Sequence, residues 1–234
     1  MRYLFVIFFS LILFAIGNSQ NKSYPFYQLY QLDSIGQSNS IGRHFGSLYF
    51  SFLQLVEKEL ESADTATQRL LRHFETIFAQ FYIDACIAYD QHEQIALPAW
   101  RAYFSDTTLH FFQYYLLGAN AHLNGGLAEA IAGSYTAAEW IQLKKKYVLF
   151  NKCLNETFKK VYKETVTNSK RARWLSILTL GLDKPLGQYY LYKWRKRQMR
   201  LTEYFYNGSA DYKIQLNKIN RKKEKIDRLV FTQF

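Results

Sequence analysis

The segment from Leu97 to Ile131 constrains the fold more than any other part of the chain. From about residue 107 to residue 132 it predicts a long helix with many leucine, aromatic and alanine side chains and almost no polar face. A helix that is hydrophobic all round is normally covered by other elements on every side. We therefore expect this segment, called the central helix below, to lie in the middle of the protein.

Helical spacing and capping residues also run through the rest of the chain, whereas strand-like alternation of useful length is absent. Pro98 suits the first turn of a short helix before the central one, and Thr136 with Glu139 forms a capping-box pattern after it. The other helices are expected at about residues 41–60, 65–90, 137–166, 171–180 and 185–206. The predicted fold is all-α, a single multi-helix bundle around a buried central helix.

The N-terminus has the layout of a secretory signal peptide. Arg2 is followed by an apolar run from Tyr3 to Ile16 and then by the small residues 17–19. This run of 14 residues is shorter than the ~20 that a membrane-spanning helix needs, and an uncleaved anchor is the alternative. Residues 1–19 are thus predicted to be a signal peptide, cleaved after Ser19, which predicts export to the periplasm or the cell envelope.

The remainder of the chain divides into three segments. Residues 20–39 contain Pro25, Gly36 and several Ser and Asn, and predict an extended lead-in. Residues 40–206 are expected to form the helical domain. Residues 207–234 predict a basic C-terminal helical tail, which is charged enough to fray.

Cys86 and Cys153 fall on two different predicted helices. In an oxidising compartment they could pair and close a loop of about 66 residues, worth roughly 4 kcal/mol in the chain-entropy model. Both also have apolar neighbours, among which a free cysteine acts as a small hydrophobic residue, so the two alternatives stay open. The chain has no CxxC motif and no paired Cys/His spacing, and we predict neither a metal nor a cofactor.

Charge is divided unevenly along the chain. Residues 20–140 include six basic and twelve acidic residues, whereas residues 141–234 include 23 and seven. The basic half could lie on an anionic membrane surface, or it could cover the acidic half of the same protein. In the aromatic–basic segment 189–206, the rings could instead face the core while Lys and Arg stems extend over it into water. Nucleic acid is not an expected partner of an exported chain.

The polar residues of the central helix fall on two separate faces at 100° per residue. One face carries Gln113, Asn120 and Asn124, which we call the amide stripe, and the nearly opposite face carries His122 and Glu129. The amide stripe could bind a polar ligand or tie neighbouring helices together, because buried amides need partners in either case. These five residues form the candidate ligand-binding site, and no catalytic residue is assigned.

Two functions from different classes are compatible with this helix. The first is a non-enzymatic binding or envelope-associated protein with a small-ligand site in the helical core. The rival is a metal-assisted or acid–base hydrolase that uses His122 and Glu129, with Asp84 or His73 supplied by the second helix; His122 could equally be a buried histidine bonded to a neighbour. The chain contains no nucleophile elbow, phosphate-binding loop or dinucleotide fingerprint.

The glycines of the central helix carry a further prediction. Gly118, Gly125 and Gly126 lie within or beside its apolar faces and lower its intrinsic helix propensity. They are expected to allow the close approach of another helix or of a ligand.

The residues around His122 also form a recognisable motif. Residues 116–131 read LLGANAHLNGGLAEAI, and Trp100 follows Pro98 shortly before them. This segment resembles the domain of unknown function 5995, an uncharacterised and mostly bacterial helical family, and the resemblance extends over about residues 41–206. The typical family pattern is an Asn-Ala-His-Ile-Asn core followed by an Asp-Leu pair. The resemblance implies a helical fold and no established activity.

The match to that pattern is incomplete. The matching residues are Asn120, Ala121, His122, Asn124 and Leu127, with Leu123 in place of the Ile. Gly126 stands at the position of the family's Asp. In the family, that carboxylate could orient the histidine or hold a metal. This chain has no carboxylate at the position, and an activity that depends on one is not expected here.

Overall fold

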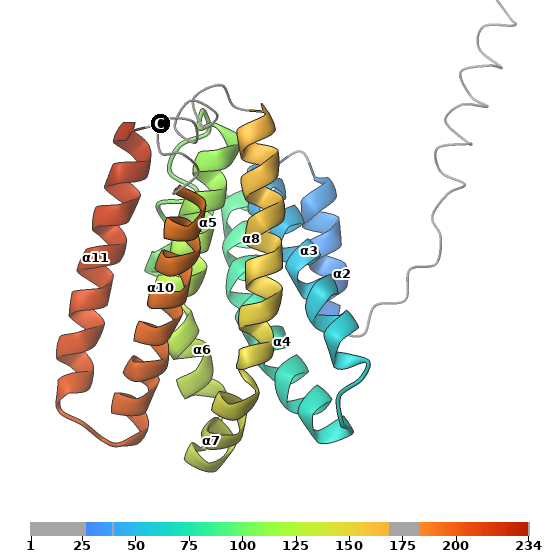
Figure 1. Cartoon of the computed structure of the whole chain (residues 1–234). Helices are drawn as coiled ribbons and strands as arrows, with labels where there is room; N and C mark the ends of the chain where they lie inside the picture. Colours follow the sequence, from blue (N-terminus) through green and yellow to red (C-terminus); the bar gives the residue numbers. More distant parts are fainter. Residues whose placement is uncertain (1–26, 39, 169–182, 234) are drawn as a thin grey trace, which may run out of the picture.

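The computed structural model describes residues 27–38, 40–168 and 183–233, and over these residues it contains helices and no strand (Figure 1). The predicted all-α class is confirmed. In chain order the elements are α2 (Tyr27–Gln37), α3 (Gly42–Leu60), α4 (Thr65–Asp90), the 3₁₀-helix η1 (Pro98–Trp100), α5 (Phe111–Gly125), α6 (Leu127–Ser134), α7 (Ala137–Lys146), α8 (Val148–Asn168), α10 (Asp183–Tyr206) and α11 (Asp211–Gln233).

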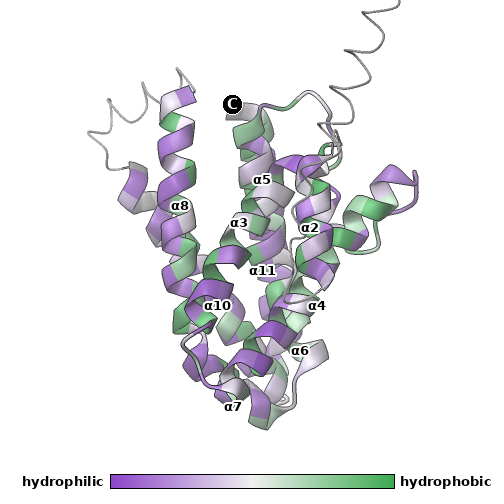
Figure 2. Ribbon diagram, turned by 90° about the vertical axis from the view of Figure 1, so that its right-hand side faces the viewer, coloured by the Kyte–Doolittle hydropathy of each residue, from purple (hydrophilic) through white to green (hydrophobic). Residues whose placement is uncertain are grey.

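Helix α5 is the centre of the bundle, as its all-round apolar sequence predicts. It packs against α3, α10, α11 and η1, and in Figure 1 it stands between α11 on one side and α3 on the other. Figure 2 shows, in contrast, hydrophilic residues along much of the peripheral helices α8 and α10. The apolar helix therefore occupies the interior, and the charged helices lie around it.

The central helix is interrupted where the sequence predicted a continuous one. It starts at Phe111 instead of residue 107, because His110 and Gln113 form a capping box that closes its first turn. Asp106, just before the expected start, accepts a hydrogen bond from the backbone N–H of Thr108 in a turn. At Gly126 the backbone leaves the helical region (φ −128°, ψ −20°), and a separate helix, α6, begins at Leu127.

The predicted extended lead-in is wrong over residues 27–37, which form α2. Leu29 and Leu32 are buried and Ile35 packs against the same core, so a stripe with a spacing of three residues holds this helix in place. Gly36 lies close to α3, where its carbonyl accepts a hydrogen bond from the hydroxyl of Ser47 at 3.1 Å. The sequence prediction missed this helix because its apolar stripe is short and several Ser and Asn residues lie around it.

The C-terminal segment is an integral part of the bundle and not a frayed tail. Helix α11 packs along α5, with Ile219 and Val230 buried and Ile226 partly buried. The helix expected over 137–166 is divided into α7 and α8 at Tyr147, whose side chain is buried in the core.

The two halves of opposite charge meet at a few ion pairs. Lys152 on α8 contacts Glu59 on α3 at 2.7 Å, and Lys146 at the end of α7 lies 3.8 Å from Asp64. The basic half thus covers part of the acidic half, although these pairs are exposed and stabilise the fold little.

The aromatic–basic segment of α10 does not turn all of its rings toward the core. Tyr189, Tyr190 and Tyr192 are each about half exposed, and the Lys193 ammonium lies 5.4 Å from the centre of the Tyr189 ring. The interpretation that the rings of this segment face inward is therefore wrong for these three. The buried residues described on α10 are Arg195, Gln198, Leu201 and Thr202, of which only Leu201 is apolar.

Cys86 and Cys153 are both buried and unpaired, and they belong to two separate apolar clusters. Burial raises the pKa of the Cys86 thiol to about 12 and that of the Cys153 thiol to about 11. The structure therefore favours the alternative in which each cysteine packs as a small hydrophobic residue.

Two predictions lie outside the described residues: the signal peptide of residues 1–19 and the helix at residues 171–180. Within the described part of the chain, none of the helices has both the length and the apolar character needed to cross a membrane.

Two glycines of α5 allow close packing of neighbouring elements, as predicted. A Cβ atom at position 118 would overlap the ring of Phe45 on α3, and one at position 125 would overlap Ala99 on η1. The approaching groups are thus protein side chains and not a ligand.

We expect Gly118→Ala to lower the free energy of unfolding by about 1–3 kcal/mol, as overpacked core substitutions do. The ring of Phe45 cannot move aside freely, because it contacts the rings of Tyr82, Trp100 and Tyr103. Urea unfolding measures the effect. Gly133→Ala on α6 is the control: a Cβ there meets nothing within 4 Å, so this variant should be neutral or more stable by up to about 1 kcal/mol. Equal stability of the two variants would contradict the described packing of α5 on α3.

Candidate functional site

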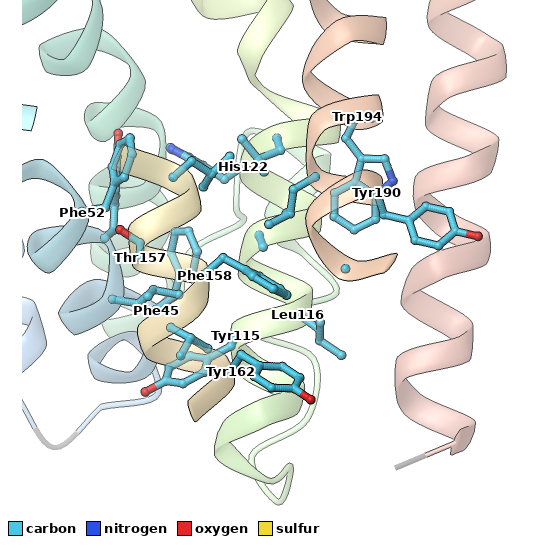
Figure 3. A pocket seen from close by; sticks show the side chains of 18 of the residues that line it. Phe45, Phe52, Tyr115, Leu116, His122, Thr157, Phe158, Tyr162, Tyr190 and Trp194 are labelled. Atoms are coloured by element: carbon cyan, nitrogen blue, oxygen red, sulfur yellow. The ribbon is translucent and has the colours of Figure 1, made fainter. Parts of the chain in front are cut away.

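A cavity of about 900 Å³ lies between α3, α4, α5, α8 and α10, and α11 contributes Ile226 and Val230 to its wall. Figure 3 shows that its labelled side chains come from helices far apart in the sequence. They are Phe45 and Phe52 from α3, Tyr115, Leu116 and His122 from α5, Thr157, Phe158 and Tyr162 from α8, and Tyr190 and Trp194 from α10. Most of the wall is aromatic or aliphatic.

A small group of polar side chains lines the cavity among these apolar walls. Glu75 on α4, His122 on α5 and Arg195 on α10 are all buried, with exposed fractions of 2, 6 and 4 %. The hydroxyls of Tyr49 and Tyr147 belong to the same region, because their pKa values respond to Glu75 and Arg195. We call these five residues the polar cluster.

Glu75 is the acid of the polar cluster. Its Oε2 atom accepts a hydrogen bond from the hydroxyl of Tyr49 at 3.1 Å. Burial raises the pKa of Glu75 to about 8, although the Tyr49 hydroxyl and the charge of Arg195 act in the opposite direction. A carboxyl group with such a pKa is mostly neutral at pH 7.

His122 lies at the centre of a set of aromatic rings. Its ring stacks on Phe78 with 3.5 Å between centroids and meets Tyr49 edge-on at 4.3 Å. Burial, together with the nearby Arg195, lowers the pKa of His122 well below its usual value, so the imidazole is neutral. Its Nδ1 atom is buried and has no hydrogen-bond partner among the described residues.

Arg195 is the cation of the polar cluster. Its guanidinium carbon lies 4.4 Å from the centre of the Tyr147 ring, which is a cation–π contact. Its Nε atom is buried and has no hydrogen-bond partner in the described part of the chain. His122 and Arg195, which both line the cavity, thus each have a buried nitrogen atom without a hydrogen-bond partner among the described residues.

The amide stripe, by contrast, ties helices together. The Nδ2 atom of Asn120 donates to the backbone oxygen of Lys223 at 2.9 Å and to Oδ1 of Asp227 at 2.7 Å, both on α11. Gln113 donates to the backbone oxygen of Val230 at 2.9 Å, and Asn124 donates to Asn120 Oδ1 at 2.8 Å. Of the two alternatives for the amide stripe, the structure therefore supports the one in which it ties neighbouring helices together.

Gln198 extends this polar network from α11 to α10. Its amide nitrogen donates to the backbone oxygen of Asn124 at 2.8 Å, and its Oε1 atom accepts from the backbone N–H of Ala128 at 3.2 Å. It therefore bonds to the two backbone groups that flank the break at Gly126. The interruption of the helix would leave the Asn124 C=O and the Ala128 N–H without partners. Both bond to Gln198 on α10 instead.

Glu129 does not join His122. The carboxylate is exposed on α6, beyond the break at Gly126. It lies near Tyr212 on α11, where burial and, to a smaller extent, the charge of Glu129 raise the pKa of the hydroxyl. Asp84 and His73, the other groups proposed for a hydrolase, are also exposed; Asp84 bonds to Gln80 at 2.7 Å. In the described part of the chain, no three His, Cys, Asp or Glu side chains are placed to hold a metal ion.

Sequence reasoning missed Glu75 and Arg195. A signal for Glu75 was present, because it lies within the apolar stripe formed by Leu71, Phe74 and Phe78 on α4 and is the charged residue of that stripe. Arg195 had no such signal. It is one of many basic residues on α10, and only the packing of α10 against α5 separates it from the exposed ones.

Comparison with known proteins gives one match. No curated protein and no solved structure matches the chain significantly. The model of a family of unknown function, DUF5995, matches residues 28–233, which extends the likeness beyond residues 41–206 to include almost all of α2 and α11. With nearly its whole length matched, this chain belongs to the DUF5995 family.

Proposed function

We propose that this protein is a non-enzymatic binding protein, and that its ligand is a largely apolar small molecule held in the cavity between α3, α5, α8 and α10. The observation that carries the proposal is the cavity itself. Protein interiors are close-packed, with few voids larger than a water molecule, whereas a volume of about 900 Å³ is within the range of ligand pockets, roughly 300–1,000 Å³.

The composition of the wall also supports binding of an apolar molecule. Ligand pockets are typically lined by hydrophobic and aromatic side chains with a few polar groups that orient the ligand. The rings of α3, α5 and α8 provide such walls, and the polar cluster provides the orienting groups. The hydrolase alternative has less support, because Glu129, the partner it requires for His122, is exposed on α6.

Filling the cavity should weaken ligand binding without unfolding the protein. Ala119 on α5 and Val161 on α8 line the cavity, so Ala119→Phe and Val161→Phe are expected to weaken binding of the neutral apolar dye N-phenyl-1-naphthylamine at least ten-fold. Fluorescence titration of the purified protein measures this. Ala138→Phe, at an exposed position on α7, should bind the dye as the wild type does. Absence of dye binding to the wild type, or unchanged binding to both cavity variants, would contradict the proposal.

We further propose that α10 contacts an anionic membrane surface, from which an apolar ligand could enter. Tyr190 is both exposed and part of the cavity wall, so it lies where the cavity meets the surface, and Tyr189 and Tyr192 are exposed on the same helix. Tyrosine and lysine side chains favour the interface between a membrane and water. The excess of basic residues after position 140 provides the attraction to anionic lipids.

Sedimentation with vesicles tests this surface. The protein should bind vesicles that contain phosphatidylglycerol at low salt, bind less at high salt, and not bind neutral vesicles. Replacing Tyr189 and Tyr192 by Ser should reduce binding, whereas Tyr27→Ser, at an exposed position on α2 on the other side of the bundle (Figure 1), should not. No binding to anionic vesicles at low salt would exclude the membrane proposal.

Export completes the proposed function and is supported by the sequence of residues 1–19. Expression of the full sequence in a bacterium should yield a periplasmic protein whose mass corresponds to a first residue at Gln20. An intact N-terminus in the membrane fraction would indicate the uncleaved anchor, and intact protein in the cytoplasm would contradict export.

A further inference from the structure

Arg195 is a buried cation without a counter-charge. Its side chain is 4 % exposed, lines the cavity and has an Nε atom with no hydrogen-bond partner. Among the described residues no carboxylate forms an ion pair with it, whereas the other buried cation, Lys223, is paired with Asp227 at 2.6 Å. An isolated buried charge is costly, and in folded proteins such charges are normally paired.

The remainder of the chain offers no acidic side chain for this role. Residues 1–26 and 169–182 contain no Asp or Glu. Asp183, at the start of α10, is twelve residues before Arg195, about 18 Å along the helix at a rise of ~1.5 Å per residue. These parts of the sequence therefore provide no counter-charge for Arg195.

The other groups of the polar cluster do not supply this charge either. Burial raises the pKa of Glu75 to about 8, so its carboxyl is mostly neutral at pH 7 and is already bonded to Tyr49. His122 is neutral, because burial and the nearby guanidinium lower its pKa. Both tyrosine hydroxyls have raised pKa values and stay protonated. The polar cluster thus carries a net positive charge in a largely apolar cavity.

We propose that the cavity binds an amphiphile with a single anionic head group, and that the guanidinium of Arg195 binds this head group. A planar guanidinium matches the geometry of a carboxylate or a phosphate, to which it can donate two parallel hydrogen bonds. The apolar tail of the ligand would lie along the apolar side chains of α5 and α8, of which Leu116, Phe158 and Tyr162 are labelled in Figure 3. This inference rests on the proposed ligand-binding function and specifies the chemical class of the ligand.

A series of ligands with one tail and different head groups tests the inference. Tetradecanoate, tetradecyl phosphate, tetradecanol and tetradecyltrimethylammonium would each be used to displace N-phenyl-1-naphthylamine from the purified protein at pH 7. The two anions are expected to bind at least about ten-fold more tightly than the alcohol, as a charge-assisted hydrogen-bonded pair does, and the ammonium most weakly. The ratio between the two anions distinguishes a carboxylate from a phosphate ligand.

Variants of α10 identify the residue responsible. In Arg195→Gln the preference for anions over the alcohol should fall below two-fold while the alcohol still binds. Arg200→Gln, at an exposed position of the same helix, should keep the preference. Circular dichroism shows whether Arg195→Gln folds. If it does not, the relative affinities of the four compounds for the wild-type protein still test the inference.

The results distinguish an error in the head-group inference from an error in the proposed binding function. If the alcohol binds to the wild type as tightly as the anions, the inference about the head group is wrong but the binding function stands. An anion preference that persists in folded Arg195→Gln would show that another group binds the head group. If neither the dye nor any of the four compounds binds, the proposed function itself is wrong.

Discussion

The attachment of α11 and α10 to α5 is the interaction on which the rest of the structure depends. Asn120 provides the centre of this attachment, because its buried amide bonds to the backbone of α11 and to the carboxylate of Asp227. That carboxylate is also paired with Lys223, and breaking a buried pair by removing one partner typically costs about 3–5 kcal/mol. A buried polar network of this kind specifies the register of the helices in a way that apolar packing alone does not.

The cavity follows from this arrangement. One face of α5 is bonded to α11 and α10, and another face, with His122, is turned toward α3, α4 and α8. Because α10 and α11 both contribute to the cavity wall, their position against α5 determines its shape. The sequence of the central helix thus separates two tasks: its amides hold the bundle together, and its histidine lines the space that the bundle encloses.

The sequence predicted the elements better than the site. The helix predicted over 65–90 matches α4, whose start is capped by Asp64, and the burial of α5 followed from its apolar surface all round. The break at Gly126 and the helix α2 were missed, because both depend on partners that are distant in the chain. His122 was correctly placed in the interior, but its pairing with Glu129 assumed a straight helix. Arg195 could not be predicted, since only the tertiary packing buries it.

Amide hydrogen exchange of α11 tests the central claim most directly. In Asn120→Leu, the account predicts that the amides of α11 lose most of their protection, because Asp227 and the backbone of Lys223 lose their donor on α5, while α3 and α4 keep theirs. Asn220→Leu, at an exposed position of α11, should leave the protection unchanged. Equal protection of α11 in Asn120→Leu and in the wild type would show that the amide stripe does not hold the bundle together.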